Sequence, residues 1–163
     1  MVKSYKPNFA KTGHSDEKSK GHATIEPVTK YMATDLITFT RDTEIIEVID
    51  TLLERRISGA PVLNEKKEVI GMIDDKDCLR ALSDSVINNQ PVSKCKTETY
   101  MDNIYKTMPV SSDVLDVANE FLKSNYKRFL IVDEKDRLIG QVSRRDILKA
   151  IKAMNITTWH KGS

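Results

Sequence analysis

The sequence predicts an α+β protein made of two tandem copies of one strand–helix–hairpin–helix unit. Residues 31–82 recur as residues 100–151 at a constant offset of 69 (100 minus 31), with no gap in the pairing. Ile70-Gly71 returns as Ile139-Gly140, for example, and most other pairs keep their polarity. A repeat this long is a whole supersecondary unit used twice. Because each copy alone is small for a stable core, we expect the two copies to bury a shared apolar face.

The first copy begins with a short strand at residues 36–39, followed by a helix. Either Asp42 or Thr43 is expected to cap that helix, since both side chains can accept a hydrogen bond from a free backbone N–H. The apolar residues of the helix recur at helical spacing: Ile45, Ile46, Val48, Ile49, Leu52 and Leu53. Residues 59–63 and 69–73 flank a polar turn, which predicts an antiparallel hairpin.

A second helix, from about Asp75 to about Leu82, is expected to close the first copy. The second copy follows the same plan. It has a predicted helix from Asp113 to about Asn125, a hairpin at residues 129–142 and a closing helix from Arg144.

The repeat also divides the chain into segments. Residues 1–24 are polar and lack apolar periodicity, so we expect a disordered or extended arm that is dispensable for folding. Between the copies, Pro91 argues against one continuous helix. The expected segments are the arm (1–24), the first motif (25–83), a linker (84–96), the second motif (97–153) and a tail (154–163).

The composition excludes several classes of function. A total of 26 Lys and Arg against 24 Asp and Glu gives a net charge of +2, which does not indicate a nucleic-acid partner. No apolar run has the length of a membrane span or a signal peptide, and Cys78 and Cys95 lack metal-ligand spacing. His14 and His22 are isolated in a polar arm, so solvated side chains are expected rather than a metal site. These features predict a cytoplasmic protein with reduced thiols and no membrane partner.

Both closing helices begin with a similar run that could carry a ligand. The runs are Gly71-Met72-Ile73-Asp74-Asp75-Lys76-Asp77 and Gly140-Gln141-Val142-Ser143-Arg144-Arg145-Asp146. A helix N-terminus offers free N–H groups to a phosphate, and a carboxylate in its first turn can accept hydrogen bonds from two ribose hydroxyls. The pattern is also close to a capping box, in which the polar residue and the Asp bind only the helix backbone. The local pattern leaves both interpretations open.

With these runs and Ile57-Ser58-Gly59-Ala60-Pro61-Val62 in the first hairpin, the chain resembles a CBS-domain pair, also called a Bateman module. The resemblance covers residues 25–153. It implies two motifs that pack through their sheets with pseudo-twofold symmetry and bind adenosine-containing ligands in the clefts between them. AMP, ADP, ATP and S-adenosylmethionine are the candidate ligands, and no catalytic cofactor is implied.

The resemblance assigns the ribose hydroxyls to the Asp that ends each run. Ser143 and Asp146 match the family pattern in full. Asp77 matches the ribose position, but Asp74 stands where the family has Ser or Thr. An acid at that position would repel a phosphate, so phosphate binding is not expected beside Asp77.

Basic residues near the two runs are the candidates for phosphate contact. Lys127 and Arg128 stand where nucleotide-binding members, including the γ subunit of AMP-activated kinase, carry a basic pair. Arg128 is the better candidate, because a planar guanidinium can bind phosphate through two hydrogen bonds. Lys76 and Arg145, each just before the Asp, are further candidates. Any of these residues could equally be a solvated surface charge.

The resemblance also places residues of the hairpin and the first strands beside the ligand. These are Thr38 and Thr107, at matching strand positions, and Gly59, Ala60 and Pro61 in the first hairpin. The alternative for the two threonines is that they are ordinary strand residues.

No catalytic constellation is visible in the sequence, so an enzyme is not expected. The resemblance implies a regulatory module, expected as a homodimer, that binds an adenosine ligand and thereby alters a separate protein partner. A structural adaptor with vestigial clefts is the alternative function.

Overall fold

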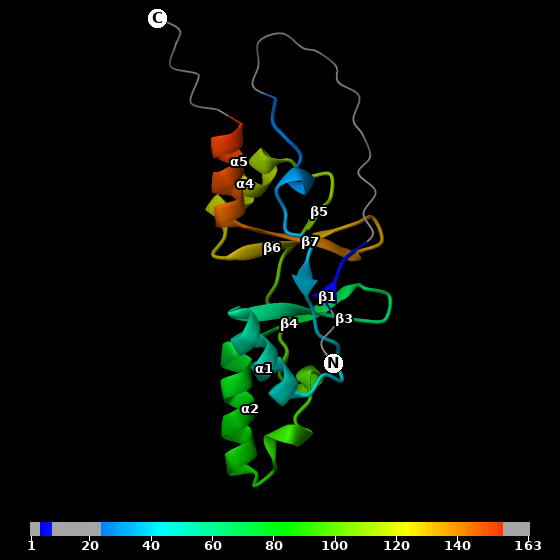
Figure 1. Ribbon diagram of the computed structural model, residues 1–163, viewed down its shortest axis with the longest axis vertical. Coiled ribbons are helices and arrows are strands. Elements are labelled where there is room, and N and C mark those ends of the chain that lie inside the picture. The colour runs from blue at the N-terminus through cyan, green and yellow to red at the C-terminus, as the bar shows by residue number, and fades with distance from the viewer. Residues whose placement is uncertain (1–3, 8–23, 155–163) are drawn as a thin grey trace, which may run out of the picture. The chain divides into compact units, whose positions relative to one another are not determined.

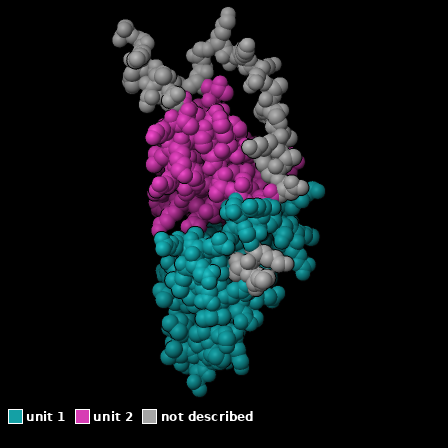
Figure 2. Space-filling model, viewed as in Figure 1, with its two compact units in different colours: residues 1–6, 35–105, 135–138 teal, residues 7–34, 106–134, 139–163 magenta. Residues whose placement is uncertain are grey.

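A computed structural model describes residues 4–7 and 24–154 and divides the chain into two compact units, which Figure 2 colours separately. Unit 1 contains residues 1–6, 35–105 and 135–138, and unit 2 contains residues 7–34, 106–134 and 139–163. Each unit holds one strand–helix–hairpin–helix repeat (Figure 1). The predicted α+β class is confirmed, because the repeat in the sequence is also a repeat in the structure.

Unit 1 carries the first repeat. Its elements are β2 (Leu36–Ile37), α1 (Ile45–Arg55), β3 (Gly59–Leu63), β4 (Val69–Asp74) and α2 (Asp75–Ile87). β3 and β4 form the predicted antiparallel hairpin, with Gly59 opposite Asp74. Phe39, shortly after β2, forms a parallel bridge with Val62 of β3. The helices α1 and α2 pack beside each other (Figure 1).

Unit 2 carries the second repeat. Its elements are β5 (Thr107–Pro109), α4 (Val114–Lys123), β6 (Arg128–Val132), β7 (Leu138–Ser143) and α5 (Arg144–Ala153). The sheet has the order β5-β6-β7, and β5 runs parallel to β6 with Thr107 opposite Leu130. The helices α4 and α5 pack beside each other, as α1 and α2 do in unit 1 (Figure 1).

A separate apolar cluster stabilises each unit. The cluster of unit 1 has a buried centre formed by Phe39, Ile45, Val48, Leu52, Val62 and Ile73. The cluster of unit 2 is centred on Val114, Val117, Phe121, Phe129, Ile131 and Val142. In unit 2 the Phe121 and Phe129 rings stack at 4.2 Å between centroids, which adds to the apolar burial.

Each cluster is completed by a segment that precedes the other repeat. The 3-10 helix η1 (Val28–Lys30) and Met32 lie in unit 2, whereas the 3-10 helix η2 (Val92–Lys94) and the short helix α3 (Thr97–Tyr100) lie in unit 1. Ala33 exchanges two backbone hydrogen bonds with Gln141, and Asp102 exchanges two with Met72. These two pairs are related by the same offset of 69, so the exchange of segments is itself part of the repeat.

The glycine that opens each predicted run makes room for the exchanged segment. A Cβ on Gly71 would come within 2.9 Å of the Asp102 carbonyl oxygen, and a Cβ on Gly140 would clash with the Met32 side chain. These glycines are therefore explained by close packing within each unit.

Some predicted boundaries and caps are wrong. The N-cap of α1 is Glu44, without a side-chain hydrogen bond, and neither Asp42 nor Thr43 serves as the cap. The N–H of Ile45 donates instead to the Cys95 carbonyl at 3.0 Å, so the exchanged segment replaces a capping side chain. α2 continues past Leu82 to Ile87, because no Pro or Gly interrupts it.

The described part of the arm includes a short strand, β1 (Ser4–Tyr5), which pairs antiparallel with β2. The Ser4 hydroxyl donates to Asp35 Oδ1 at 2.6 Å, and Lys67 Nζ lies 5.3 Å from the centre of the Tyr5 ring. The arm therefore contributes contacts to unit 1 that its polar composition did not indicate.

Removal of residues 1–23 should lower the melting temperature by about 2–4 °C. The lost contacts are solvent-exposed and together contribute about 1 kcal/mol, which corresponds to that shift in a chain of this size. Thermal unfolding of the full chain and of a chain beginning at Thr24 measures the difference. Tyr5→Ala in the full chain should reproduce part of it, and an unchanged melting temperature after truncation would contradict the role given to β1.

Candidate functional site

The helix α5 begins on a capping box formed by Ser143 and Asp146. The Ser143 N–H donates to Asp146 Oδ2 at 2.8 Å, and the Asp146 N–H donates to Ser143 Oγ at 3.3 Å. The Ser143 hydroxyl also donates to Asp146 Oδ2 at 2.8 Å. The Asp146 side chain is 21% exposed, and its Oδ1 lies 3.9 Å from Lys149 Nζ. The carboxylate therefore holds the helix start and remains accessible to a second partner.

The helix α2 begins on the matching capping box, formed by Asp74 and Asp77. The Asp77 N–H donates to Asp74 Oδ1 at 2.9 Å, and the Asp74 N–H donates to Asp77 Oδ2 at 3.0 Å. The other carboxylate oxygen of Asp77 lies 3.0 Å from Arg80 Nη2, and the Asp77 side chain is only 2% exposed. Both oxygens of Asp77 are thus engaged within the protein.

The predicted basic residues of unit 2 lie at the starts of β6 and α5. Arg128 is the first residue of β6, and Ser143 is the last residue of the neighbouring β7. Consecutive strands of a hairpin run in opposite directions, so Arg128 lies at the same end of the sheet as the capping box. Lys127 and Arg145 are exposed beside these positions. In unit 1, Lys76 is likewise exposed in the first turn of α2.

The remaining predicted residues lie on strands. Thr107 is exposed at the start of β5, and Thr38 is half-buried between β2 and Phe39. Gly59, Ala60 and Pro61 are buried in β3, where Gly59 pairs with Asp74 at the start of α2.

The sequence reasoning missed the residues three positions after each motif Asp. Arg80 and Lys149 stand at matching places in the repeat and approach Asp77 and Asp146 respectively. Their i,i+3 spacing from a carboxylate on the same helix was the signal that could have found them.

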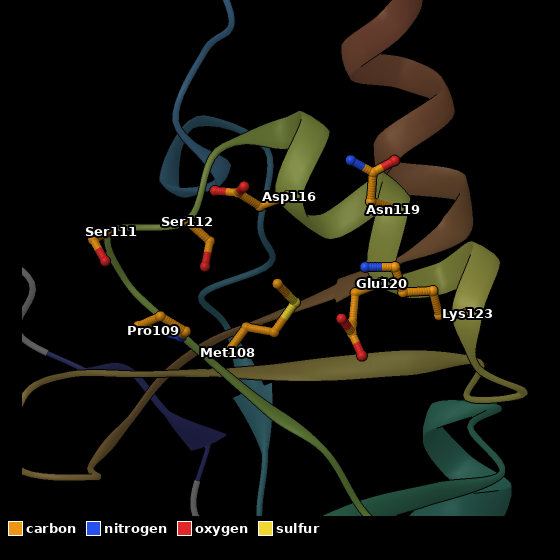
Figure 3. Close-up of a pocket in the computed structure, with 8 residues that line it drawn as sticks. All are labelled: Met108, Pro109, Ser111, Ser112, Asp116, Asn119, Glu120 and Lys123. Carbon is orange, nitrogen blue, oxygen red and sulfur yellow. The ribbon is translucent and has the colours of Figure 1, made fainter.

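A surface hollow of about 420 Å³ lies elsewhere in unit 2, between the end of β5 and one side of α4 (Figure 3). It is lined by Met108, Pro109, Ser111, Ser112, Asp116, Asn119, Glu120 and Lys123. None of the predicted ligand residues belongs to this lining, which mixes acidic, amide and basic groups. The hollow therefore does not coincide with the α5 motif.

A family model described as "CBS domain" matches residues 28–84 and again residues 98–153. The two matches together account for more than half of the chain, and they contain the capping boxes that start α2 and α5 respectively. The chain belongs to the CBS-domain family. The suspected resemblance is thereby confirmed for both repeats.

Several known proteins are similar to this chain. Protein MJ1225 of Methanocaldococcus jannaschii is 28% identical over 126 residues, which are 77% of this chain and 43% of that protein. The structure of CBSX2 in complex with AMP has a TM-score of 0.67 at 20% identity and covers 80% of this chain and 98% of that one. The CBS pair of protein MJ0100, with 5′-methylthioadenosine and S-adenosyl-L-methionine, has a TM-score of 0.62 at 24% identity, with the same two coverages.

The surroundings of the first CBS motif shift the titration of its acid. Burial raises the pKa of Asp77 to about 6, and the nearby Asp74 carboxylate acts in the same direction. Burial also raises the pKa of the adjacent Cys78 thiol to about 11, so this thiol stays protonated near neutral pH.

Within the described residues, no helix is both long and apolar enough to cross a membrane.

Lowering the pH from 7.5 to 5 should stabilise the CBS pair through Asp77. In the folded chain Asp77 takes up a proton near pH 6, whereas in the unfolded chain its pKa has the ordinary value of 3.8. Stability from this group therefore rises as the pH falls through 6, by about 1 kcal/mol at pH 5 and by about 3 kcal/mol in all once the pH is below 4, where the effect levels off. Denaturant unfolding of the parent and of Asp77→Asn across this range measures the effect. A rise of the same size in the variant would show that another group is responsible.

Proposed function

We propose that this CBS pair binds an adenosine-containing ligand at the start of α5 and thereby alters its affinity for a separate protein partner. The observation that carries the proposal is the accessible Asp146 carboxylate, ordered by Ser143 at a helix N-terminus. Two ribose hydroxyls can donate to such a carboxylate. AMP, 5′-methylthioadenosine and S-adenosyl-L-methionine, the ligands of the CBSX2 and MJ0100 structures, share this ribose.

The charges of unit 2 favour a ligand that carries phosphate. Arg128 lies at the same end of the sheet as Ser143, and Lys127 and Arg145 are exposed close by. The free N–H groups and the positive end of the α5 dipole add to the attraction. AMP, ADP and ATP therefore precede S-adenosylmethionine as candidates for this motif.

The proposed active form is a homodimer. Four exposed apolar residues of α1 and α2 recur in α4 and α5 at the offset of 69, and we call these sets the repeated apolar faces. They are Ile46, Leu53, Leu79 and Leu82 in unit 1, and Leu115, Leu122, Leu148 and Ile151 in unit 2. Large apolar side chains gathered on exposed helix faces are typical of protein interfaces. Two equivalent faces suit a second copy of the same chain related by twofold symmetry.

Regulation would follow if the ligand binds one arrangement of the dimer better than another, because it then shifts the population toward that arrangement. The alternative function is an adaptor that dimerises without a ligand. In unit 1, Asp74 and the engaged carboxylate of Asp77 favour this alternative, because they leave the first motif poorly suited to a ligand. Unit 2 has no such feature at Ser143 and Asp146.

Thermal unfolding with and without AMP, ADP, ATP, adenosine and S-adenosylmethionine tests the proposal. A ligand present at a hundred times its dissociation constant should add about 2.7 kcal/mol to the folded state. For a chain of this size the melting temperature should then rise by about 5–11 °C. If none of the five compounds raises it, the adaptor function is the better account.

A further inference from the structure

The two CBS motifs differ at the cap residue, Asp74 against Ser143, and at a second position that contacts the motif Asp. Position 80 is Arg and the matching position 149 is Lys, each three residues after the motif Asp. Arg80 Nη2 lies 3.0 Å from Asp77, whereas Lys149 Nζ lies 3.9 Å from Asp146. The shorter contact goes with the buried carboxylate, which is 2% exposed, and the longer contact goes with the carboxylate that is 21% exposed.

The chemistry of the two side chains explains the difference. A guanidinium presents several N–H donors in a rigid plane that matches a carboxylate, whereas an ammonium on a flexible stem is strongly hydrated and holds a carboxylate less firmly. Arg80 is itself 52% exposed, so it approaches Asp77 from the solvent side of the helix. The oxygens of Asp77 already serve Arg80 and the Asp74 N–H, and with the side chain 2% exposed a ribose can reach their remaining lone pairs only if Arg80 moves aside.

We propose that Arg80 is a latch that closes the first motif to ligand, and that Lys149 leaves the second motif open. This inference rests on the proposed function. It makes the two motifs unequal, so the second is occupied first and the first accepts a nucleoside only when Arg80 releases Asp77. Because Asp74 repels phosphate, the ligand of the unlatched first motif is a nucleoside without phosphate.

An exchange of the two residues tests the latch, because each substitution imports the residue that the other repeat already carries. Isothermal titration with adenosine, which lacks phosphate, should give one bound equivalent for the parent and two for Arg80→Lys. Adding Asp77→Ala to Arg80→Lys should remove the second equivalent. Lys149→Arg should weaken adenosine binding at the second motif about tenfold, which is the cost of competing with one charge-assisted hydrogen bond.

The outcomes separate this inference from the proposed function. One equivalent in both the parent and Arg80→Lys would overturn the latch and leave the proposed function standing. Two equal equivalents in the parent, of which one is lost in Asp77→Ala, would also overturn it. If the parent binds neither adenosine nor AMP, the proposed function fails and the latch fails with it. Circular dichroism of each variant confirms that the exchange preserves the fold.

Discussion

Asp146→Ala should weaken AMP binding by about tenfold to more than a hundredfold. The substitution removes the carboxylate that we propose accepts two ribose hydroxyls, and charge-assisted hydrogen bonds of this kind contribute about 1.5–3 kcal/mol. The substitution also removes the capping hydrogen bond from the Ser143 N–H, so the free energy of unfolding should fall by about 1 kcal/mol. Isothermal titration gives the affinity, and denaturant unfolding gives the stability change separately.

Two variants serve as matched controls for Asp146→Ala. Asp77→Ala, at the equivalent position of the first motif, should change AMP affinity much less, because Asp77 is engaged by Arg80 and its neighbour Asp74 repels phosphate. Arg128→Ala should weaken AMP binding strongly and adenosine binding hardly at all, since only AMP presents a phosphate to the guanidinium. If Asp146→Ala binds AMP as tightly as the parent, the motif is only a helix cap.

The parts of the fold that the sequence predicted depend on local chemistry. The starts of α2 and α5 were readable because each helix begins on a polar residue with an acid three positions later, and both capping boxes form. The hairpins were readable from their apolar runs and polar turns. The repeat then made each prediction in one half a check on the other.

The features that escaped prediction depend on contacts distant in sequence. The cap of α1 could not be read from Asp42 or Thr43, because the Cys95 carbonyl accepts the Ile45 N–H. Residues 25–34, which were expected to belong to the first motif, group with unit 2 instead. The arm was expected to be dispensable for folding, and its polar composition could not indicate the cation–π contact of Tyr5 with Lys67, a partner 62 positions away (67 minus 5).

The candidate site shows the same division. Ser143 and Asp146 were found from their spacing, and the structure brings Arg128 to the same end of the sheet. The sequence alone could not show that Asp77 is buried and Asp146 accessible, since both exposures depend on the packing around the two helix starts. This difference in burial supports the proposal that the two motifs bind ligand unequally.

Leu122→Glu should convert the proposed homodimer into a monomer. The Leu122 side chain is 85% exposed in the single chain, so a charge there costs the folded monomer little. In a twofold interface the substitution occurs twice, and burying each unpaired carboxylate costs several kcal/mol, so the dimer dissociation constant should rise at least about a hundredfold. Light scattering at micromolar concentration should then report 18.5 kDa instead of twice that mass.

Comparable exposed residues locate the interface. Leu53→Glu, at the matching position of unit 1 and 72% exposed, should dissociate the dimer to a similar extent, because both repeated apolar faces take part. Ile104→Glu is the control, since Ile104 is 73% exposed but lies outside the helices of both faces. A parent chain that is already monomeric would rule out the homodimer. If Ile104→Glu dissociated the dimer while Leu122→Glu did not, the contact would have to lie away from the helix faces.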